Sequence, residues 1–126
     1  MRTLGFAEPG ELRDELTALV LARQKTATAG VWRVDYEPDQ EEIESVGEHL
    51  VVLDSLEQPT AIIEITRVQS HPFIEVPWEL ARDEGEGWDS IEDFRSGHRR
   101  YYEATGVTLA DTDLMICVWF KVVEQP

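Results

Sequence analysis

Several features that define large classes of proteins are scarce in this chain of 126 residues. It has one cysteine, Cys117, which cannot form a disulfide within the chain, so the sequence predicts a reducing environment and a cytoplasmic localisation. No run approaches the ~20 apolar residues that span a bilayer, and the N-terminus lacks the basic-then-apolar pattern of a secretory signal. We therefore expect no membrane partner, and we expect Cys117, which lies in a strand-like apolar segment, to be a buried side chain and not a nucleophile.

Basic residues are also few. The chain has 26 Asp and Glu against 11 Lys and Arg, a net charge of −15, and phosphate binding depends on Lys and Arg. This balance argues against long duplex DNA and anionic membranes as partners. Apolar residues nonetheless make up 42% of the chain and aromatics 9%, which predicts one globular domain over residues 1–126 and not a disordered acidic tail.

Metal and cofactor motifs are missing. The three histidines, His49, His71 and His98, lack the spacing of zinc ligands, and the sequence has no P-loop, no dinucleotide fingerprint and no nucleophile elbow. The sequence therefore predicts neither a metal nor another cofactor.

The negative charge is unevenly distributed. Residues 1–35 hold five acidic and five basic side chains, so the whole net charge lies in residues 36–126. Two acidic blocks, 37–48 and 79–93, dominate, and a basic cluster of Arg95, His98, Arg99 and Arg100 follows the second block. Most of the acidic residues are expected to form a solvated face, while a local anion-binding site remains possible near the basic residues.

Hydrophobic periodicity predicts an α+β fold. Helices are expected over 9–24, with Leu12, Leu16, Leu19 and Arg23 on one face, over 76–83, and from a Ser90 cap to about residue 104. Strands are expected over 26–34, 49–54, 60–69 and 113–123, the middle two forming an antiparallel hairpin. Short connections between strands favour a small, strongly curved antiparallel sheet or a mostly antiparallel β-barrel of about five to six strands, with three helices packed around it.

The first candidate site lies where the first helix passes into the first strand, in the sequence Lys-Thr-Ala-Thr from Lys25 to Thr28. On a regular strand Lys25 and Thr28 would face opposite sides, because their separation is odd. They can share a pocket only if the chain is not yet extended at Lys25. The alternative is that Lys25 has only a structural role, because a cation at the end of a helix is stabilised by the negative end of the helix dipole.

The second candidate is the Glu84-Gly85-Glu86-Gly87 loop and the helix after it. Glycines let the backbone approach a ligand closely, but spacing alone does not decide which glutamate points inward, and a plain surface loop is the alternative. On the helix, an anion-binding and base-stacking face is one interpretation and a mixed structural face is the other. The candidate substrate-binding residues are Thr26, Trp88, Arg95, His98 and Tyr102, and Trp88 is the tryptophan expected to be exposed, whereas Trp32, Trp78 and Trp119 are expected to anchor the core.

Taken in order, these segments resemble the ASCH family, a domain related to the PUA-like RNA-binding barrels, over nearly the whole chain. The resemblance rests on four motifs in order. The first helix ends in Lys-Thr-x-Thr, a Val-Val-Leu-Asp strand follows Val-Gly, a Pro-Phe-x-x-Val turn comes next, and Ala-x-x-Glu-Gly-x-Gly precedes a Ser-x-x-x-aromatic-x-x-x-His helix. The residues of these motifs are Lys25 to Thr28, then Val46, Gly47 and Val51 to Asp54, then Pro72, Phe73 and Val76, and last Ala81, Glu84, Gly85, Gly87, Ser90, Phe94 and His98. Gln24 departs from the family, where a basic residue is common, and Phe94 stands where a tryptophan is common.

The resemblance implies a β-barrel with a cleft between barrel and helices. It also implies an amidohydrolase that acts on N4-acylated cytidine. The catalytic lysine, threonine and glutamate of such an enzyme would be Lys25, Thr28 and Glu84. Glu84 would be the general base and then the proton donor. Thr28 would orient the nucleophile or donate to the oxyanion, and Lys25 would stabilise the oxyanion or, as a neutral amine, attack directly. Other family members are ribonucleases or RNA-binding modules, so the expected partner is a nucleoside, a nucleotide or short single-stranded RNA. An acidic interaction domain without any ligand is a further alternative.

Overall fold

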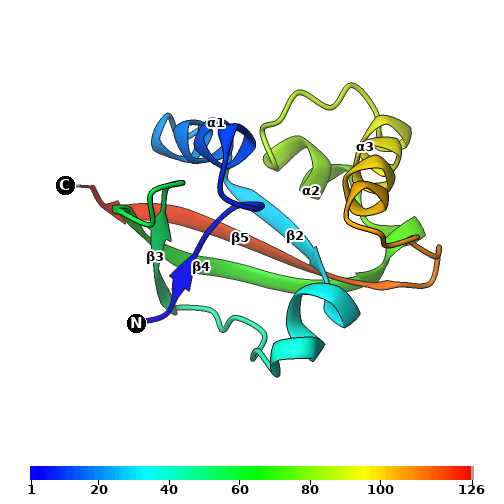
Figure 1. Cartoon of the computed structure of the whole chain (residues 1–126), viewed down its shortest axis with the longest axis horizontal. Helices are drawn as coiled ribbons and strands as arrows, with labels where there is room; N and C mark the ends of the chain where they lie inside the picture. The colour runs from blue at the N-terminus through cyan, green and yellow to red at the C-terminus, as the bar shows by residue number, and fades with distance from the viewer. Residues whose placement is uncertain (126) are drawn as a thin grey trace.

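A five-stranded sheet forms the centre of the computed structural model, which describes residues 1–125 (Figure 1). The strand order is β1-β3-β4-β5-β2, and the strands are β1 (Thr3–Leu4), β2 (Ala27–Val31), β3 (His49–Leu53), β4 (Pro59–Pro72) and β5 (Leu114–Glu124). Each neighbouring pair is antiparallel except β1 and β3, which run parallel. The predicted hairpin of the second and third expected strands is confirmed as β3 and β4.

The sheet is mostly antiparallel, as expected, but the expected barrel is not confirmed. The described sheet is open, because its outer strands β1 and β2 each pair with one neighbour and not with each other. It is also mixed, because the chain begins with a two-residue strand that runs parallel to β3 and that has no signal in the sequence. A strand of two residues supplies too few hydrogen bonds to close a barrel.

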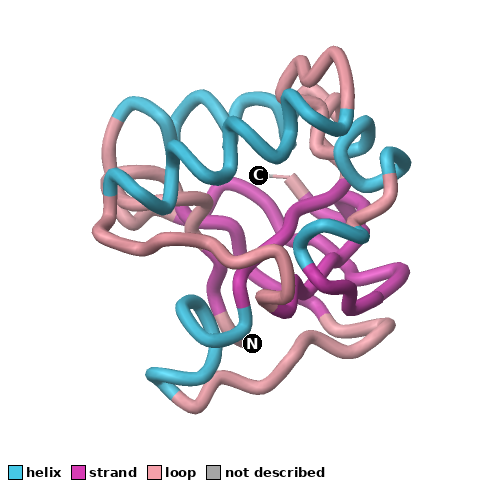
Figure 2. The backbone as a smooth tube through the Cα atoms, turned by 90° about the vertical axis from the view of Figure 1, so that its right-hand side faces the viewer, coloured by secondary structure: helices cyan, strands magenta, loops and turns pink. Residues whose placement is uncertain are grey.

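Three α-helices pack against this sheet: α1 (Glu11–Leu21), α2 (Trp78–Asp83) and α3 (Ile91–Ala104). They gather on one side of the strands in both Figure 1 and Figure 2. The predicted cap of the last helix is confirmed, since the Ser90 hydroxyl accepts from the Asp93 backbone N–H at 3.1 Å. The predicted face of α1 is off by one residue, because Arg13, Thr17 and Val20 are its buried residues.

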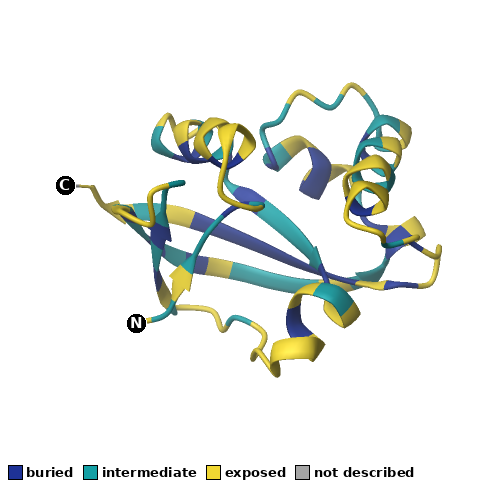
Figure 3. Cartoon of the chain, in the orientation of Figure 1, coloured by how far each residue is buried: buried dark blue, intermediate teal, exposed yellow. Residues whose placement is uncertain are grey.

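The apolar core consists of two clusters divided by β5. Alternate residues of this strand enter different clusters: Met115, Cys117 and Trp119 enter one, and Ile116, Val118 and Phe120 enter the other. Both faces of β5 are therefore covered, as the dark blue centre of the strand shows in Figure 3. Cys117 is buried as predicted, and Trp119 is a core residue, but Trp32 and Trp78 are 37% and 41% exposed and do not anchor the core.

A π-helical turn, η1 (Trp32–Tyr36), shortens the strand that was expected to continue to residue 34. The Asp35 carboxylate accepts a hydrogen bond from the Val31 backbone N–H at 2.8 Å, which takes a donor that another strand would otherwise use. Gly30 leaves room for this turn, because a Cβ there would lie 3.2 Å from that carboxylate. The turn directs Asp35 and Tyr36 toward the cleft described below, as π-helical turns often do at functional sites.

Candidate functional site

A cleft of about 560 Å³ lies between the segment from β1 to α1, the strand β2, η1, the loop after α2, and α3. Lys25, Thr28 and Glu84, the three residues predicted to be catalytic, all line it. Glu86, His98 and Tyr102 line it too. The described structure therefore brings together side chains that lie up to 77 positions apart in the sequence, from Lys25 to Tyr102.

Lys25 reaches the cleft because it lies between two regular elements. Helix α1 ends at Leu21, Arg23 takes a left-handed conformation with φ 61°, and β2 begins only at Ala27. Lys25 is thus outside the strand, so the odd spacing from Thr28 does not separate the two side chains. Thr28 reaches the same cleft from within β2.

The Lys25 side chain is 1% exposed, and its nitrogen Nζ has three acceptors. It donates to the Ala27 carbonyl at 2.9 Å and to the Glu84 carbonyl at 3.5 Å, and it forms an ion pair with Glu86 Oε2 at 2.8 Å. Three acceptors match the three N–H groups of an ammonium, whereas a neutral amine has two. This arrangement holds Lys25 as a buried cation.

Glu84 is the buried carboxylate of the cleft, with a side chain that is 2% exposed. Its Oε1 accepts from Trp88 Nε1 at 3.0 Å, and its Oε2 lies 3.5 Å from His98 Nε2. Burial alone raises the pKa of this carboxyl, but the charge and hydrogen bond of His98, with Lys25 and Trp88, outweigh burial and bring the pKa below its usual value. Glu84 is therefore an ionised carboxylate near neutral pH.

His98 shows the opposite shift. Burial lowers the pKa of its imidazole, but the Glu84 carboxylate raises it more, and the net pKa lies above its ordinary value. The other ring nitrogen, Nδ1, lies 3.0 Å from the Phe94 carbonyl, so both ring nitrogens have acceptors, as an imidazolium requires. Glu84 and His98 form a buried ion pair at the floor of the cleft.

This pair predicts a pH-dependent contribution to stability. Because the pKa of His98 is raised in the fold, its contribution to stability is complete below about pH 6.5 and is lost as the pH rises through the folded pKa. Because the pKa of Glu84 is lowered, its contribution is complete above about pH 4.5. We expect His98→Gln to lower the free energy of unfolding by about 3 kcal/mol between these values and by less at higher pH. Urea denaturation across this range measures the difference.

His49→Gln is the matched control, because His49 pairs with Glu64 at 3.1 Å on the surface, where its side chain is 43% exposed. It should change the free energy of unfolding by no more than about 0.5 kcal/mol. A loss for His98→Gln that does not vary with pH would contradict a charged pair.

Of the predicted substrate-binding residues Thr26, Arg95 and Tyr102, only Tyr102 lines the cleft, and all three form hydrogen bonds within the protein. Thr26 does not line the cleft, and its backbone N–H and hydroxyl both donate to the Asp83 carbonyl. Arg95 also lies outside the cleft lining and donates to the Ile74 carbonyl at 2.8 Å. Tyr102 lines the cleft, and its hydroxyl donates to Asp35 Oδ2 at 2.6 Å.

Trp88 is not the exposed aromatic that was expected. Its ring packs against Gly97, where a Cβ would overlap it, and meets the Phe94 ring edge-on at 6.2 Å. It lines the cleft as a partly buried wall that also holds Glu84. Tyr101, 36% exposed at the cleft, is the more accessible aromatic.

Glu86 and Asp35 are two residues of the cleft whose contacts the sequence did not reveal. Glu86 was considered only as a rival to Glu84, although it is the carboxylate that contacts Lys25. Asp35 was not singled out, because nothing in its neighbours signals the π-helical turn that brings it to the cleft.

The cleft is strongly acidic. Its lining includes Arg13, Lys25 and His98 against six carboxylates, those of Glu8, Asp35, Glu41, Glu44, Glu84 and Glu86.

Within residues 1–125, no group of three or more His, Cys, Asp and Glu side chains is arranged to hold a metal ion. No described helix is long and apolar enough to cross a membrane.

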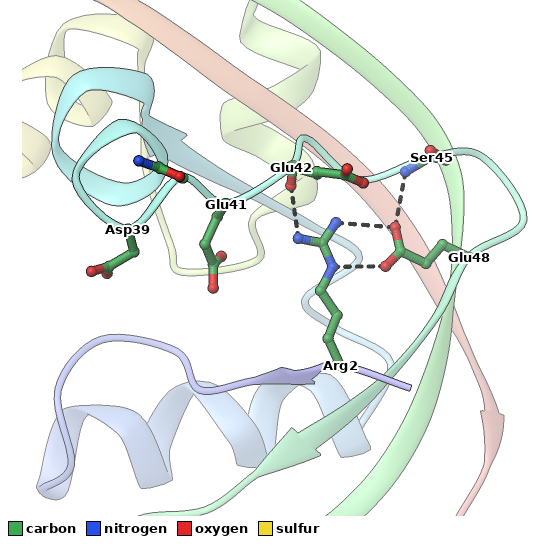
Figure 4. Close-up of a pocket in the computed structure, with 7 residues that line it drawn as sticks. Arg2, Asp39, Glu41, Glu42, Ser45 and Glu48 are labelled. Atoms are coloured by element: carbon green, nitrogen blue, oxygen red, sulfur yellow. Dashed lines mark hydrogen bonds and ion pairs between the residues drawn. The ribbon is translucent and has the colours of Figure 1, made fainter.

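A second hollow, of about 580 Å³, is lined by Arg2 and by residues 39–48 (Figure 4). Its one cation is already paired, because Arg2 donates to both oxygens of Glu48 and to the Glu42 carbonyl. Asp39 and Glu41 point away from that guanidinium in Figure 4. The hollow lacks the buried lysine, threonine and histidine of the first cleft, so we place the candidate site in the first.

Comparison with solved structures shows close relatives in shape. An ASCH domain from Lactobacillus crispatus JV V101 has a TM-score of 0.82 at 26% identity, covering 98% of this chain and 80% of that one. A protein from Enterococcus faecalis V583 has a TM-score of 0.81 at 26% identity, covering 98% of this chain and 75% of that one. A mutant of the ZmASCH protein from Zymomonas mobilis, at 9% identity and a TM-score of 0.53 over 85% of this chain and 63% of that one, shares the fold alone.

Among curated protein sequences, none matches this chain. The model of the ASCH domain family matches residues 3–124, which is almost the whole chain. The solved ASCH domain structure of similar shape agrees with that match. This chain belongs to the ASCH domain family and has its PUA-like fold.

Proposed function

We propose that this protein is a small hydrolase that removes the acyl group from N4-acylated cytidine or a similar nucleoside. One observation carries the proposal: a buried ammonium, a buried carboxylate and a hydroxyl, from Lys25, Glu84 and Thr28, line a single cleft. These are the groups that hydrolysis of an amide requires. The ammonium can stabilise an oxyanion, and the carboxylate can move a proton.

The proposed reaction splits the exocyclic amide with one water. The water oxygen bonds to the acyl carbon and the carbon–nitrogen bond breaks. One water proton passes to the leaving amine, and the products are the free nucleoside and a carboxylic acid, which ionises. No redox step or cofactor is needed.

Lys25 is assigned to the oxyanion and not to direct attack. Its three acceptors indicate an ammonium, which has no lone pair for a nucleophile. An ammonium in a site of low water content stabilises a developing alkoxide strongly. Thr28, which also lines the cleft, would orient the attacking water.

Glu84 is assigned as the base that accepts the water proton. Its lowered pKa keeps it ionised near neutral pH. The same property makes it a weak base, so the neighbouring imidazolium of His98, whose pKa is raised, supports the return of a proton to the leaving amine.

The charge of the cleft favours a neutral nucleoside over a polyanion. Six lining carboxylates would repel the phosphates of RNA, whereas a ribose offers hydroxyl donors to them. Tyr101, accessible at the cleft, offers a ring on which a base can stack.

A substrate panel tests this proposal. We expect the protein to hydrolyse N4-acetylcytidine with a kcat/KM about tenfold or more above that for its 5′-monophosphate, as roughly 1.4 kcal/mol of repulsion would give. Chromatographic detection of cytidine measures both reactions. An oligoribonucleotide carrying the same modified base should react more slowly still.

The outcomes separate the alternatives. Cleavage of the oligoribonucleotide backbone would favour a ribonuclease, and binding of the nucleoside without turnover would favour a non-catalytic binding module. Either result would contradict the proposed hydrolase. A preference for the phosphorylated substrate would contradict the role given to the acidic lining.

A further inference from the structure

We propose that Lys25 forms a carboxylate-binding site that Glu86 covers when no ligand is bound. Its natural ligand would be the carboxylate product of the proposed hydrolysis, so the identity of that ligand rests on the proposed function. The site itself does not, because it follows from the contacts of Lys25. The ligand class is a monocarboxylate, and acetate serves as the probe.

The contacts of Lys25 leave one position for a ligand. Two of its three acceptors are backbone carbonyls: that of Ala27, fully buried in β2, and that of Glu84, at the end of α2. The Ala27 carbonyl belongs to the β2 backbone, and the Glu84 backbone is held as the cap of α2, where its N–H donates to the Leu80 carbonyl at 2.9 Å. The third acceptor, Glu86 Oε2 at 2.8 Å, is a side chain. Any substrate oxygen that reaches the ammonium must therefore replace the Glu86 carboxylate.

The local backbone permits such a replacement. The Glu86 side chain is 21% exposed, whereas that of Lys25 is 1% exposed, so the carboxylate has solvent on one side. Gly85 and Gly87 flank it with φ of 67° and 88°. Gly85 is packed tightly against the backbone at Gln24, while a Cβ at Gly87 would meet nothing within 4 Å. The loop is thus fixed before Glu86 and open after it.

The chemistry of the resting state identifies the ligand. An ammonium in contact with a side-chain carboxylate has the geometry that a carboxylate product would need at the same nitrogen. During the proposed reaction the acyl oxygen would take the place of Glu86 first as a carbonyl, then as an oxyanion and finally as a carboxylate. Return of Glu86 would then expel the product, which the acidic lining also repels.

Removing the covering carboxylate should expose the site. We expect Glu86→Ala to bind acetate at least about tenfold more tightly than the unchanged protein. In the variant, acetate no longer competes with the Glu86 carboxylate for the charge-assisted hydrogen bond of the Lys25 ammonium. Chemical-shift titration of the whole chain with sodium acetate, at constant ionic strength set with sodium chloride, measures the dissociation constant. Glu86→Gln, which keeps the size of the side chain, should change the affinity in the same direction.

Glu8→Ala is the matched control. Glu8 lines the same cleft and its replacement removes the same charge, but it makes no contact with Lys25. If the general charge of the cleft were responsible, both replacements would tighten acetate binding equally, and that result would overturn the proposal. Affinities for Glu86→Ala and Glu86→Gln equal to that of the unchanged protein would overturn it as well.

A second replacement locates the ligand. Adding Lys25→Met to Glu86→Ala should abolish the gain in acetate affinity, and a gain that persists would place the carboxylate elsewhere and overturn the proposal. Because acetate binding is measured without turnover, the two proposals can fail separately. A gain in affinity in a protein that hydrolyses no acylated nucleoside would refute the hydrolase and support the covered site.

Discussion

Replacing Lys25 by methionine should lower kcat/KM for N4-acetylcytidine by about 10²–10³-fold, the usual effect of removing one donor to an oxyanion. Methionine is close to lysine in length and fills the space of a side chain that is 1% exposed. It removes the ammonium without opening a large cavity, so the loss should appear in turnover more than in folding. Steady-state kinetics with the unchanged protein and the variant measure it.

Lys121→Met provides the matched control, since Lys121 is the other lysine of the chain and lies on β5 with its side chain 62% exposed. It undergoes the same chemical change outside the cleft lining and should leave kcat/KM within a factor of two or so. Equal turnover by Lys25→Met and Lys121→Met would show that the buried ammonium takes no part in the reaction.

The central residues of the site could be predicted from the sequence, because they belong to an ordered set of motifs. Lys25, Thr28 and Glu84 were placed together by that resemblance, and all three line the cleft. Which carboxylate forms the ion pair with Lys25 could not be predicted. The choice between the carboxylates of Glu84 and Glu86 depends on the backbone of a four-residue loop, and spacing gives no information about its φ angles.

The regular elements with strong local signals were predicted closely. The Ser90 cap, the hairpin of β3 and β4, and the apolar β5 were all found within a few residues of their bounds. The expected barrel is not confirmed, and the reason is not local, since β1 is two residues long and its partner β3 lies more than 40 positions away. The early end of β2 depends on one side chain, Asp35, that bonds back to Val31.

Gly85 is the position where a single methyl group should damage both fold and site. Its φ of 67° is left-handed, and a Cβ there would overlap the Gln24 carbonyl oxygen and lie 2.6 Å from the Gln24 carbonyl carbon and 2.9 Å from the Lys25 Cα. We expect Gly85→Ala to lower the free energy of unfolding by roughly 2–5 kcal/mol, combining left-handed strain with overpacking. Thermal and urea denaturation measure this loss.

Gly87→Ala separates the two causes. Gly87 has a similar left-handed φ of 88°, but a Cβ there would meet nothing within 4 Å, so only the strain of about 1–2 kcal/mol should remain. The difference between the two variants is therefore the cost of pushing the loop away from Gln24 and Lys25. Equal losses for both would mean that this contact yields easily. A larger loss for Gly85→Ala, accompanied by lost turnover in the fraction that stays folded, would show that close packing of the two segments is what brings the Lys25 ammonium to the Glu84 carbonyl and the Glu86 carboxylate.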